Sequence, residues 1–320
     1  MVLKEKQNFQ VYPAKQFVVP NDRLSKKLFN MTKEDFQNWI NQRKTYNLVE
    51  ILQHRKFGKI LSPVKLSVDD ENFIISEPLD QFHCAVLCAV ISEFYANNHQ
   101  TTVPIIYRAI TGKVNRGSRS IPSKKQVVDI KNAIHLLMHL QINYNPTELC
   151  EKIGYNNGKS KEIVSVLLPC RRVEFTTING QDADVIELLG ESPLLTSAKM
   201  KNNQILTYAT ELLDVPNMNN SRMNIGLKHY TMRRIQEILL HRQLQTIITF
   251  EDLFYKSQIE NASFKTKKDA RDVVVTFFEH LKNKRVVKSF EIKKQRNAFH
   301  SIEFVPIRKR ERQLIIDVYD

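Results

Sequence analysis

The chain has 320 residues, of which 42% are hydrophobic and only 8 are glycine. This composition predicts a globular protein of roughly two domains, at about 150 residues each, and excludes a collagen-like repeat or a wholly disordered chain. The 48 Lys and Arg residues exceed the 34 Asp and Glu residues by 14. An excess of this size favours a polyanionic partner, with nucleic acid as the leading class.

The positive charge is concentrated in the last third of the chain. Residues 221–320 hold 21 Lys and Arg against 12 Asp and Glu, a net of +9. No run approaches the ~18 apolar residues of a membrane span, and the first ten residues lack the apolar core of a secretion signal. Four cysteines are too few for a disulfide framework in a chain of this length. We therefore expect a cytoplasmic protein with reduced thiols, no membrane contact, no cofactor and no metal.

Residues 1–72 predict an N-terminal arm, one helix and short strands. Residues 1–31 are of mixed composition and predict no strong element. Thr32 can cap a helix through residues 31–54, with Phe36, Trp39 and Ile40 on its apolar face. Residues 60–76 are typical of two short strands around a turn at residues 69–72.

Residues 73–190 predict a compact domain of three helices followed by strands. The apolar period indicates helices at 79–98, at 102–112 with Pro104 near its start and Gly112 at its end, and at 123–142 with Ser123 as N-cap. Strands are expected at 162–169, 171–178 and 183–189. The Asn-Gly pair at 179–180 suits the tight turn of a β-hairpin between the last two strands.

The same order returns after residues 191–222, which predict a linker ending in the turn-rich "PNMNNS". Residues 225–241 predict a helix, 249–259 a short helix capped by Thr249, and 265–284 a third helix with one apolar stripe. Strands follow at 285–292 and 299–307. The tail, 309–320, is interpreted as a partner-binding peptide, a final strand or a frayed end.

Three helices followed by a β-hairpin are the order of a winged helix. The predicted fold is therefore α+β and mostly helical, with two tandem winged-helix domains at 73–190 and 223–308. In such a domain the second and third helices form a helix-turn-helix, and the third enters the major groove of DNA by its N-terminal part. The expected activity is binding of double-stranded DNA, without enzymatic chemistry.

The start of each third helix and the tip of the second wing supply the candidate DNA contacts. A helix dipole disfavours cations at the N-terminus, so basic residues there point to phosphates and base edges. In the second domain the candidates are Lys265, Lys267, Lys268, Arg271, Lys293, Lys294 and Arg296; in the first they are Arg116, Arg119, Ser123, Lys124, Lys125 and Lys131. Because the first hairpin turn is not basic, dimerisation or partner docking competes with DNA contact there. Basic residues that merely keep the surface soluble are the plain alternative.

Several stretches resemble the replication initiator (Rep) proteins of bacterial plasmids and related mobile elements. They are "IIYRAITGKV" at 105–114, "SPLLTSAKMKNNQIL" at 192–206, "HYTMRRIQEILLH" at 229–241 and "FEHLKNK" at 278–284. The resemblance extends from about residue 75 to 306. It implies binding to repeated sites at a replication origin, promotion of origin opening, dimerisation through the first winged-helix domain, and recruitment of the host replicative helicase or its loader.

Other readings of single motifs are weaker. "GYNNGKS" at 154–160 has three residues between its glycines, where a phosphate-binding loop has four. His135 and His139 are one turn apart but lack a third metal ligand and a catalytic Glu. Tyr230 follows His229, yet this pair alone is not the site of a nuclease or relaxase. A winged-helix transcriptional repressor, a DNA-processing enzyme and a structural or partition protein that coats DNA remain alternative functions.

Overall fold

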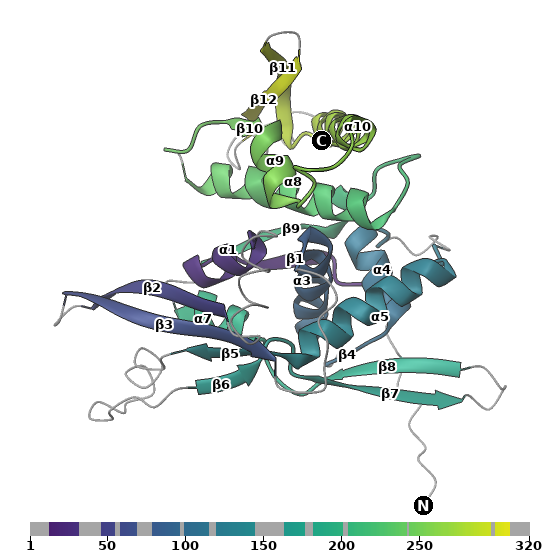
Figure 1. Ribbon diagram of the computed structural model, residues 1–320. Coiled ribbons are helices and arrows are strands. Elements are labelled where there is room, and N and C mark those ends of the chain that lie inside the picture. The colour runs from purple at the N-terminus through teal and green to yellow at the C-terminus, as the bar shows by residue number, and fades with distance from the viewer. Residues whose placement is uncertain are drawn as a thin grey trace, which may run out of the picture.

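The computed structural model describes residues 13–31, 46–54, 58–68, 79–96, 99–114, 120–144, 163–176, 182–200, 204–241, 243–295 and 298–307. The fold is α+β, with helices in the centre and small antiparallel sheets around them (Figure 1). Among these residues no helix combines the length and apolar character that a bilayer crossing requires. The predicted Asn-Gly turn, the glycine-rich stretch at 154–160 and the tail at 309–320 lie outside the described residues.

The N-terminal segment is more ordered than the sequence predicted. It forms strand β1 (Gln16–Pro20) and helix α1 (Arg23–Phe29), so the expectation of no strong element was wrong. Asp22 caps α1 by accepting from the Ser25 amide at 3.1 Å, and its second oxygen accepts from Ser197 Oγ at 2.6 Å. Ser197 belongs to α7 (Pro193–Met200), so the cap also ties α1 to a helix much later in the chain.

Residues 191–222, predicted as a linker, also form regular structure. They contain α7, strand β9 (Ile205–Ala209) and the 3-10 helix η1 (Thr210–Leu213). Strand β9 pairs antiparallel with β1, from Gln16 opposite Ala209 to Pro20 opposite Ile205. This pairing joins the beginning of the described chain to the stretch between the two helical units.

Residues 46–54 were predicted as the end of a helix and are instead strand β2 (Tyr46–His54). β2 pairs with β3 (Gly58–Val68), and the sheet continues through β5 (Leu140–Tyr144) to β6 (Ile163–Val166), in the order β2-β3-β5-β6. The helix prediction failed because the strand is stabilised by backbone pairing with β3, which a local apolar period does not reveal. The helix predicted at 123–142 also ends earlier than expected, at His139, and β5 begins at the next residue.

The first module (Gln81–Leu188) contains helices α3 (Gln81–Ala96), α4 (Val103–Thr111) and α5 (Lys124–His139) and strands β4 (Gln100–Thr101), β7 (Cys170–Thr176) and β8 (Asp182–Leu188). The three strands form a sheet in the order β4-β8-β7. β5 and β6 are an insertion between α5 and β7, and they belong to the separate four-stranded sheet.

The second module (Arg222–Pro306) has the same order of helices and strands as the first, without an insertion. Its elements are α8 (Arg222–Leu240), β10 (Ile247–Thr249), α9 (Phe250–Lys256), α10 (Phe264–Asn283), β11 (Val287–Gln295) and β12 (Ala298–Pro306). The sheet order is β10-β12-β11, which corresponds strand for strand to β4-β8-β7. Thr249 caps α9 as predicted, accepting from the Asp252 amide at 3.2 Å.

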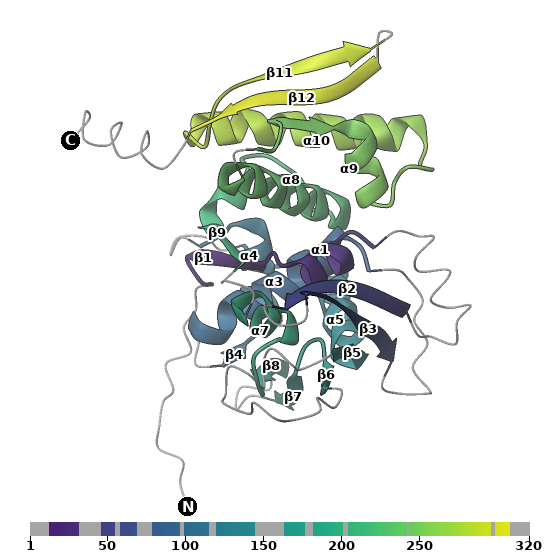
Figure 2. The same cartoon turned by 90° about the vertical axis from the view of Figure 1, so that its left-hand side faces the viewer.

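The modules are joined through their first helices, which pack on each other. α8 contacts α3, α10 contacts α8, and α5 contacts α3, so four helices form a stack in the order α5-α3-α8-α10. In Figure 2 the hairpin β11-β12 covers α10, and α10 in turn lies over α8. Each third helix therefore lies at the outer end of the stack.

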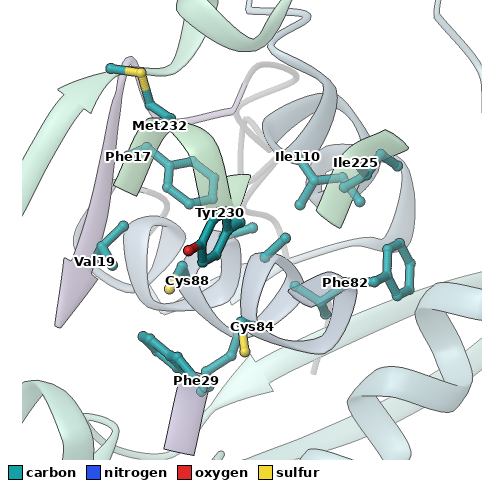
Figure 3. Packing of buried hydrophobic residues seen from close by; sticks show 14 of the residues in the cluster. Phe17, Val19, Phe29, Phe82, Cys84, Cys88, Ile110, Ile225, Tyr230 and Met232 are labelled. Carbon is teal, nitrogen blue, oxygen red and sulfur yellow. The ribbon is translucent and has the colours of Figure 1, made fainter. Parts of the chain in front are cut away.

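The hydrophobic core is continuous across both modules. α3 is buried on all sides, from Gln81 to Glu93. Figure 3 shows its cysteines, Cys84 and Cys88, packed in one cluster with Tyr230 of α8 and Phe17 of β1. Burial raises the pKa of the Cys84 thiol to about 12, as expected for a small core residue rather than a reactive thiol.

Helices α4 and α8 meet at η1 through unusually close contacts. Gly112 ends α4 with a φ of 80°, and a Cβ placed there would lie 2.2 Å from the Asp214 nitrogen. Lys113 forms an ion pair with Asp214, and the Nζ of Lys228, 1% exposed, donates to Leu213 O at 2.8 Å and Asn220 Oδ1 at 3.2 Å. Burial lowers the pKa of Lys228 to about 7. The charge of Lys113 lowers this pKa further, whereas that of Asp214 raises it.

Substituting Gly112 tests this contact. Gly112→Ala should lower the free energy of unfolding by about 2–4 kcal/mol, because alanine disfavours positive φ and its Cβ overlaps backbone. Gly190→Ala is the matched control, since the nearest atom to its new Cβ is Pro169 Cγ at 3.9 Å. It should change stability by no more than about 1 kcal/mol. Equal losses of unfolding free energy for the two variants in urea would contradict the close contact of Gly112 with Asp214.

The buried amine predicts a specific pH dependence. Between about pH 7 and 10 the unfolded chain keeps a proton on Lys228 that the folded chain has released, so Lys228 makes a contribution to the free energy of unfolding that should rise with pH, by up to about 1.4 kcal/mol per unit. The buried thiols of Cys84, Cys88 and Cys170 act in the opposite direction above about pH 8.5, so the contribution is read as the difference between the wild type and a variant without the amine. Lys228→Met should lack this rise, whereas Lys284→Met, at an exposed position, should keep it. Unfolding midpoints at pH 7, 8 and 9 measure the difference. Parallel profiles for Lys228→Met and the wild type would contradict it.

Candidate nucleic-acid interface

Helix α10 has one buried face and an open, basic start. Ser263 caps it, accepting from the Thr266 amide at 3.1 Å. The buried face consists of Ala270, Val274, Phe277, Phe278 and Leu281, all at most 1% exposed. Lys265 and Lys268 are exposed on the first two turns, and Lys267 is half-buried. The helix is therefore held to the core along its length while its basic start faces outward.

The positive charge at the start of α10 has little compensation within the protein. The first turn has no acidic residue, and within the described ranges Lys265, Lys267 and Lys268 have no ion-pair partner. Asp269 and Asp272 follow, both exposed. Cations at a helix N-terminus oppose the helix dipole, so this arrangement is unfavourable for the helix alone. An external anion at this position would offset that cost.

Arg271 differs from the lysines that precede it. It is half-buried, and its guanidinium carbon lies 5.2 Å from the ring centre of Phe254 and 5.8 Å from that of Phe250, both on α9. Its Nε is buried without a hydrogen-bond partner among the described residues. Arg271 thus packs α10 against α9, in addition to any contact that its terminal nitrogens make outside the protein.

The hairpin β11-β12 contributes further basic residues. Lys294 is exposed, and Lys293 pairs with Glu291 at 2.8 Å and Glu303 at 3.6 Å on the hairpin surface. Both lysines were predicted in the loop and lie at the end of β11 instead. Arg296 lies outside the described residues. The hairpin therefore has charges of both signs, with Lys293 and Lys294 near its tip and Glu291 and Glu303 beside Lys293.

The start of α5 occupies the corresponding place in the first module. Ser123 forms a capping box with Gln126, and Lys124 and Lys125 are exposed. The Nε2 of Gln126 donates to Asn220 O at 2.8 Å, which ties this helix start to the segment before α8. Arg116 and Arg119 lie outside the described residues. Of the six residues predicted in the first domain, the structure brings Ser123, Lys124 and Lys125 together.

Lys131 and the hairpin β7-β8 form a charge-balanced group. Lys131 pairs with Asp184, which also accepts from Arg172 at 3.2 Å, and Arg171 pairs with Glu187 at 2.5 Å. Although partial burial alone would raise the pKa of Asp184, Lys131 and Arg172 hold it below its usual value. The acidic residues of β8 therefore neutralise much of the positive charge of β7 and of the middle of α5.

The structure exposes three further aromatic and basic residues on α9, α10 and β11 that the sequence patterns did not single out. Phe264, the first residue of α10, is 78% exposed, and Tyr255 of α9 is 43% exposed with Lys256 Nζ 5.2 Å from its ring centre. Lys288 of β11 is exposed as well. An apolar residue just after the N-cap Ser263 was the available signal for Phe264, because it falls outside the buried stripe of the helix.

Two motifs that could suggest other chemistry are structural. His229 donates from Nε2 to Ile110 O at 3.2 Å and accepts from the Tyr208 hydroxyl at Nδ1, at 3.1 Å. Burial lowers the pKa of His229 to about 3, so its imidazole is neutral. The hydroxyl of Tyr230, 3% exposed, donates to Asp252 at 2.5 Å. Over the described ranges, no three His, Cys, Asp or Glu side chains are placed to hold a metal ion.

No family model matches the chain, and no curated protein matches it either. Two solved structures of domains 2 and 3 of RctB superpose on it at low similarity. One has a TM-score of 0.41 and 11% identity and covers 84% of this chain and 94% of its own. The other, of selenomethionine derivatives, has a TM-score of 0.37 and 9% identity over 81% and 91%. Superpositions this loose do not establish a shared fold.

Proposed function

We propose that the chain is a sequence-specific double-stranded DNA-binding protein with two tandem winged-helix modules. The exposed, uncompensated lysines at the start of α10 carry this proposal. They occur on a helix whose opposite face is fixed in the core, next to a hairpin that carries the exposed Lys294 near its tip. A rigid helix that presents cations at its N-terminal end suits the major groove, where phosphates line the entrance.

The connection of the elements supports the winged-helix assignment. Both modules run helix, strand, helix, helix, strand, strand, and both sheets place the last strand between the other two. α9 and α10 then correspond to a helix-turn-helix, and β11-β12 to the wing. α4, α5 and β7-β8 correspond to the same parts of the first module.

The helix stack sets the distance between the two predicted reading helices. Packed helices lie about 8–10 Å apart, so three contacts from α5 to α10 span at most about 25–30 Å. Successive major grooves on one side of DNA repeat every ~34 Å. This upper limit is shorter than that repeat, so contact of the two modules with neighbouring grooves would require the DNA to curve towards the protein.

The His229–Tyr230 pair does not fit the site of a DNA-processing enzyme. A relaxase needs an accessible tyrosine hydroxyl, whereas the hydroxyl of Tyr230 is buried on Asp252, and burial raises its pKa. His229, beside it in the chain, is engaged by Ile110 and Tyr208 instead. The proposed activity is therefore binding without strand cleavage.

Paired double variants test the DNA-binding assignment. Lys265→Ala with Lys268→Ala should weaken binding about tenfold or more and reduce the slope of log K against log salt by about 2, because two phosphate contacts are lost. Lys282→Ala with Lys284→Ala changes the same charge at the other, equally exposed end of α10 and should have little effect. Fluorescence anisotropy at several salt concentrations, on DNA selected from a random pool, measures both. Equal losses from the two pairs would contradict the orientation of α10.

The sequence resemblance to plasmid initiators supports a proposed role in replication initiation, with dimerisation through the first module and recruitment of a replicative helicase or its loader. The proposed cytoplasmic location rests on the cysteine content and on the absence of an apolar signal in the sequence. Footprinting on the DNA that flanks the gene separates initiation from repression. Direct repeats protected in tandem are the expected result, because an initiator assembles on repeated sites. A single inverted repeat over a promoter would identify a repressor, and metal-dependent nicking of supercoiled DNA would identify an enzyme.

A further inference from the structure

The turn between α9 and α10 is fastened to the other half of the molecule by one side chain. Gln258 is 7% exposed and has a φ of 58°, which is uncommon for a residue other than glycine. Its Nε2 donates to Met31 O at 3.0 Å and to Leu79 O at 2.7 Å. Met31 follows α1, and Leu79 precedes α3, so one amide from the second module holds two backbone segments outside it.

Gln81 makes the reciprocal connection. It is the first residue of α3 and is 3% exposed. Its Nε2 donates to Phe29 O at 2.6 Å and to Lys256 O, the last residue of α9, at 3.0 Å. We call Gln81 and Gln258 the glutamine latch. Each uses both amide protons on backbone carbonyls, and each crosses between the second module and the rest of the chain.

Neighbouring contacts reinforce the latch on the same side. Arg233 of α8 donates from Nη2 to Asn30 Oδ1 at 2.9 Å, and its guanidinium lies 5.2 Å from the Phe29 ring centre. The segment 29–31 is thus held by Gln81, Gln258 and Arg233 together. A buried amide that loses its hydrogen-bond partner costs free energy, so these bonds restrain displacement of the end of α9 from the start of α3.

We propose that the glutamine latch fixes the distance and rotational phase between α5 and α10, and so makes binding depend on the spacing of two DNA half-sites. Gln81 and Gln258 are then positioning residues that set specificity without touching DNA. The inference rests on the proposed function, because it takes α5 and α10 as the reading helices. Gln258 is suited to the role because the turn it occupies leads directly into α10.

The physical consequence follows from the helical repeat of DNA. An insertion of 5 bp turns the second half-site to about the opposite side of the duplex, and 10 bp restores its direction but moves it one turn away. A protein with fixed modules can engage both half-sites at only one spacing. A protein in which α9 and α10 can shift by a few ångströms relative to α3 tolerates neighbouring spacings, at the cost of weaker binding to the best site.

The experiment uses the full chain and DNA that the wild type selects from a random pool, with 0, 2, 5 or 10 bp inserted between the footprinted halves. The wild type should lose about tenfold or more in affinity on the 2-bp and 5-bp insertions. Gln81→Ala and Gln258→Asn should lose less than about threefold on the 2-bp insertion and still lose about tenfold on the 5-bp insertion, because the packing of α3 on α8 remains. Asparagine tolerates positive φ, so Gln258→Asn keeps the turn while its side chain is one methylene too short for both bonds.

The control is Thr249→Ala, which removes the cap of α9 within the second module and none of the latch bonds. This variant should keep the wild-type dependence of affinity on half-site spacing even though it lowers the free energy of unfolding. The inference is overturned if the latch variants keep that dependence on the 2-bp insertion, if Thr249→Ala flattens it equally, or if the bound wild type already tolerates the 2-bp insertion. A wild type that selects no DNA sequence overturns the proposed function itself.

Discussion

The packing of α3 against α8 is the contact on which the rest of the molecule depends. Gly226 of α8 permits it, because a Cβ there would lie 3.1 Å from Gln81 Cβ and 3.2 Å from the Phe82 nitrogen. Each of these helices is the first of its module, so every later helix and strand is placed relative to this contact. It also explains why one hydrophobic cluster extends through both modules instead of two separate cores.

Buried polar groups make this junction specific as well as tight. Lys228 and His229, adjacent on α8, are both buried, and each satisfies its hydrogen bonds on elements outside the second module. Leu213 O, Ile110 O and the Tyr208 hydroxyl are their partners. A buried amine or imidazole without such partners costs free energy, so displaced arrangements of α8 are disfavoured. The low pKa values of both groups follow from the same burial.

Local signals in the sequence predicted what local forces determine. The helices of both modules follow from apolar stripes and from the caps Thr249 and Ser123, and the exposure of Lys265 and Lys268 follows from the stripe of α10. β2, β1 and the pairing of β1 with β9 depend on partners far along the chain, so the sequence pattern did not predict them. The packing of Arg271 on α9 and the pairing of Lys131 with Asp184 are non-local for the same reason. Counting charges could not distinguish these two residues from the exposed lysines.

The two modules have the same order of helices and strands but differ in how their positive charge is balanced. In the first, Asp184 and Glu187 of β8 neutralise Lys131, Arg171 and Arg172. In the second, the lysines at the start of α10 have no ion-pair partner within the described ranges. Since phosphate contacts supply most of the salt-dependent affinity for DNA, the second module, with three lysines at the start of α10 against two at the start of α5, should supply the larger share in the proposed complex. In the same proposal, Lys124 and Lys125 at the start of α5 add a second point of contact, whose position relative to α10 is set by the helix stack.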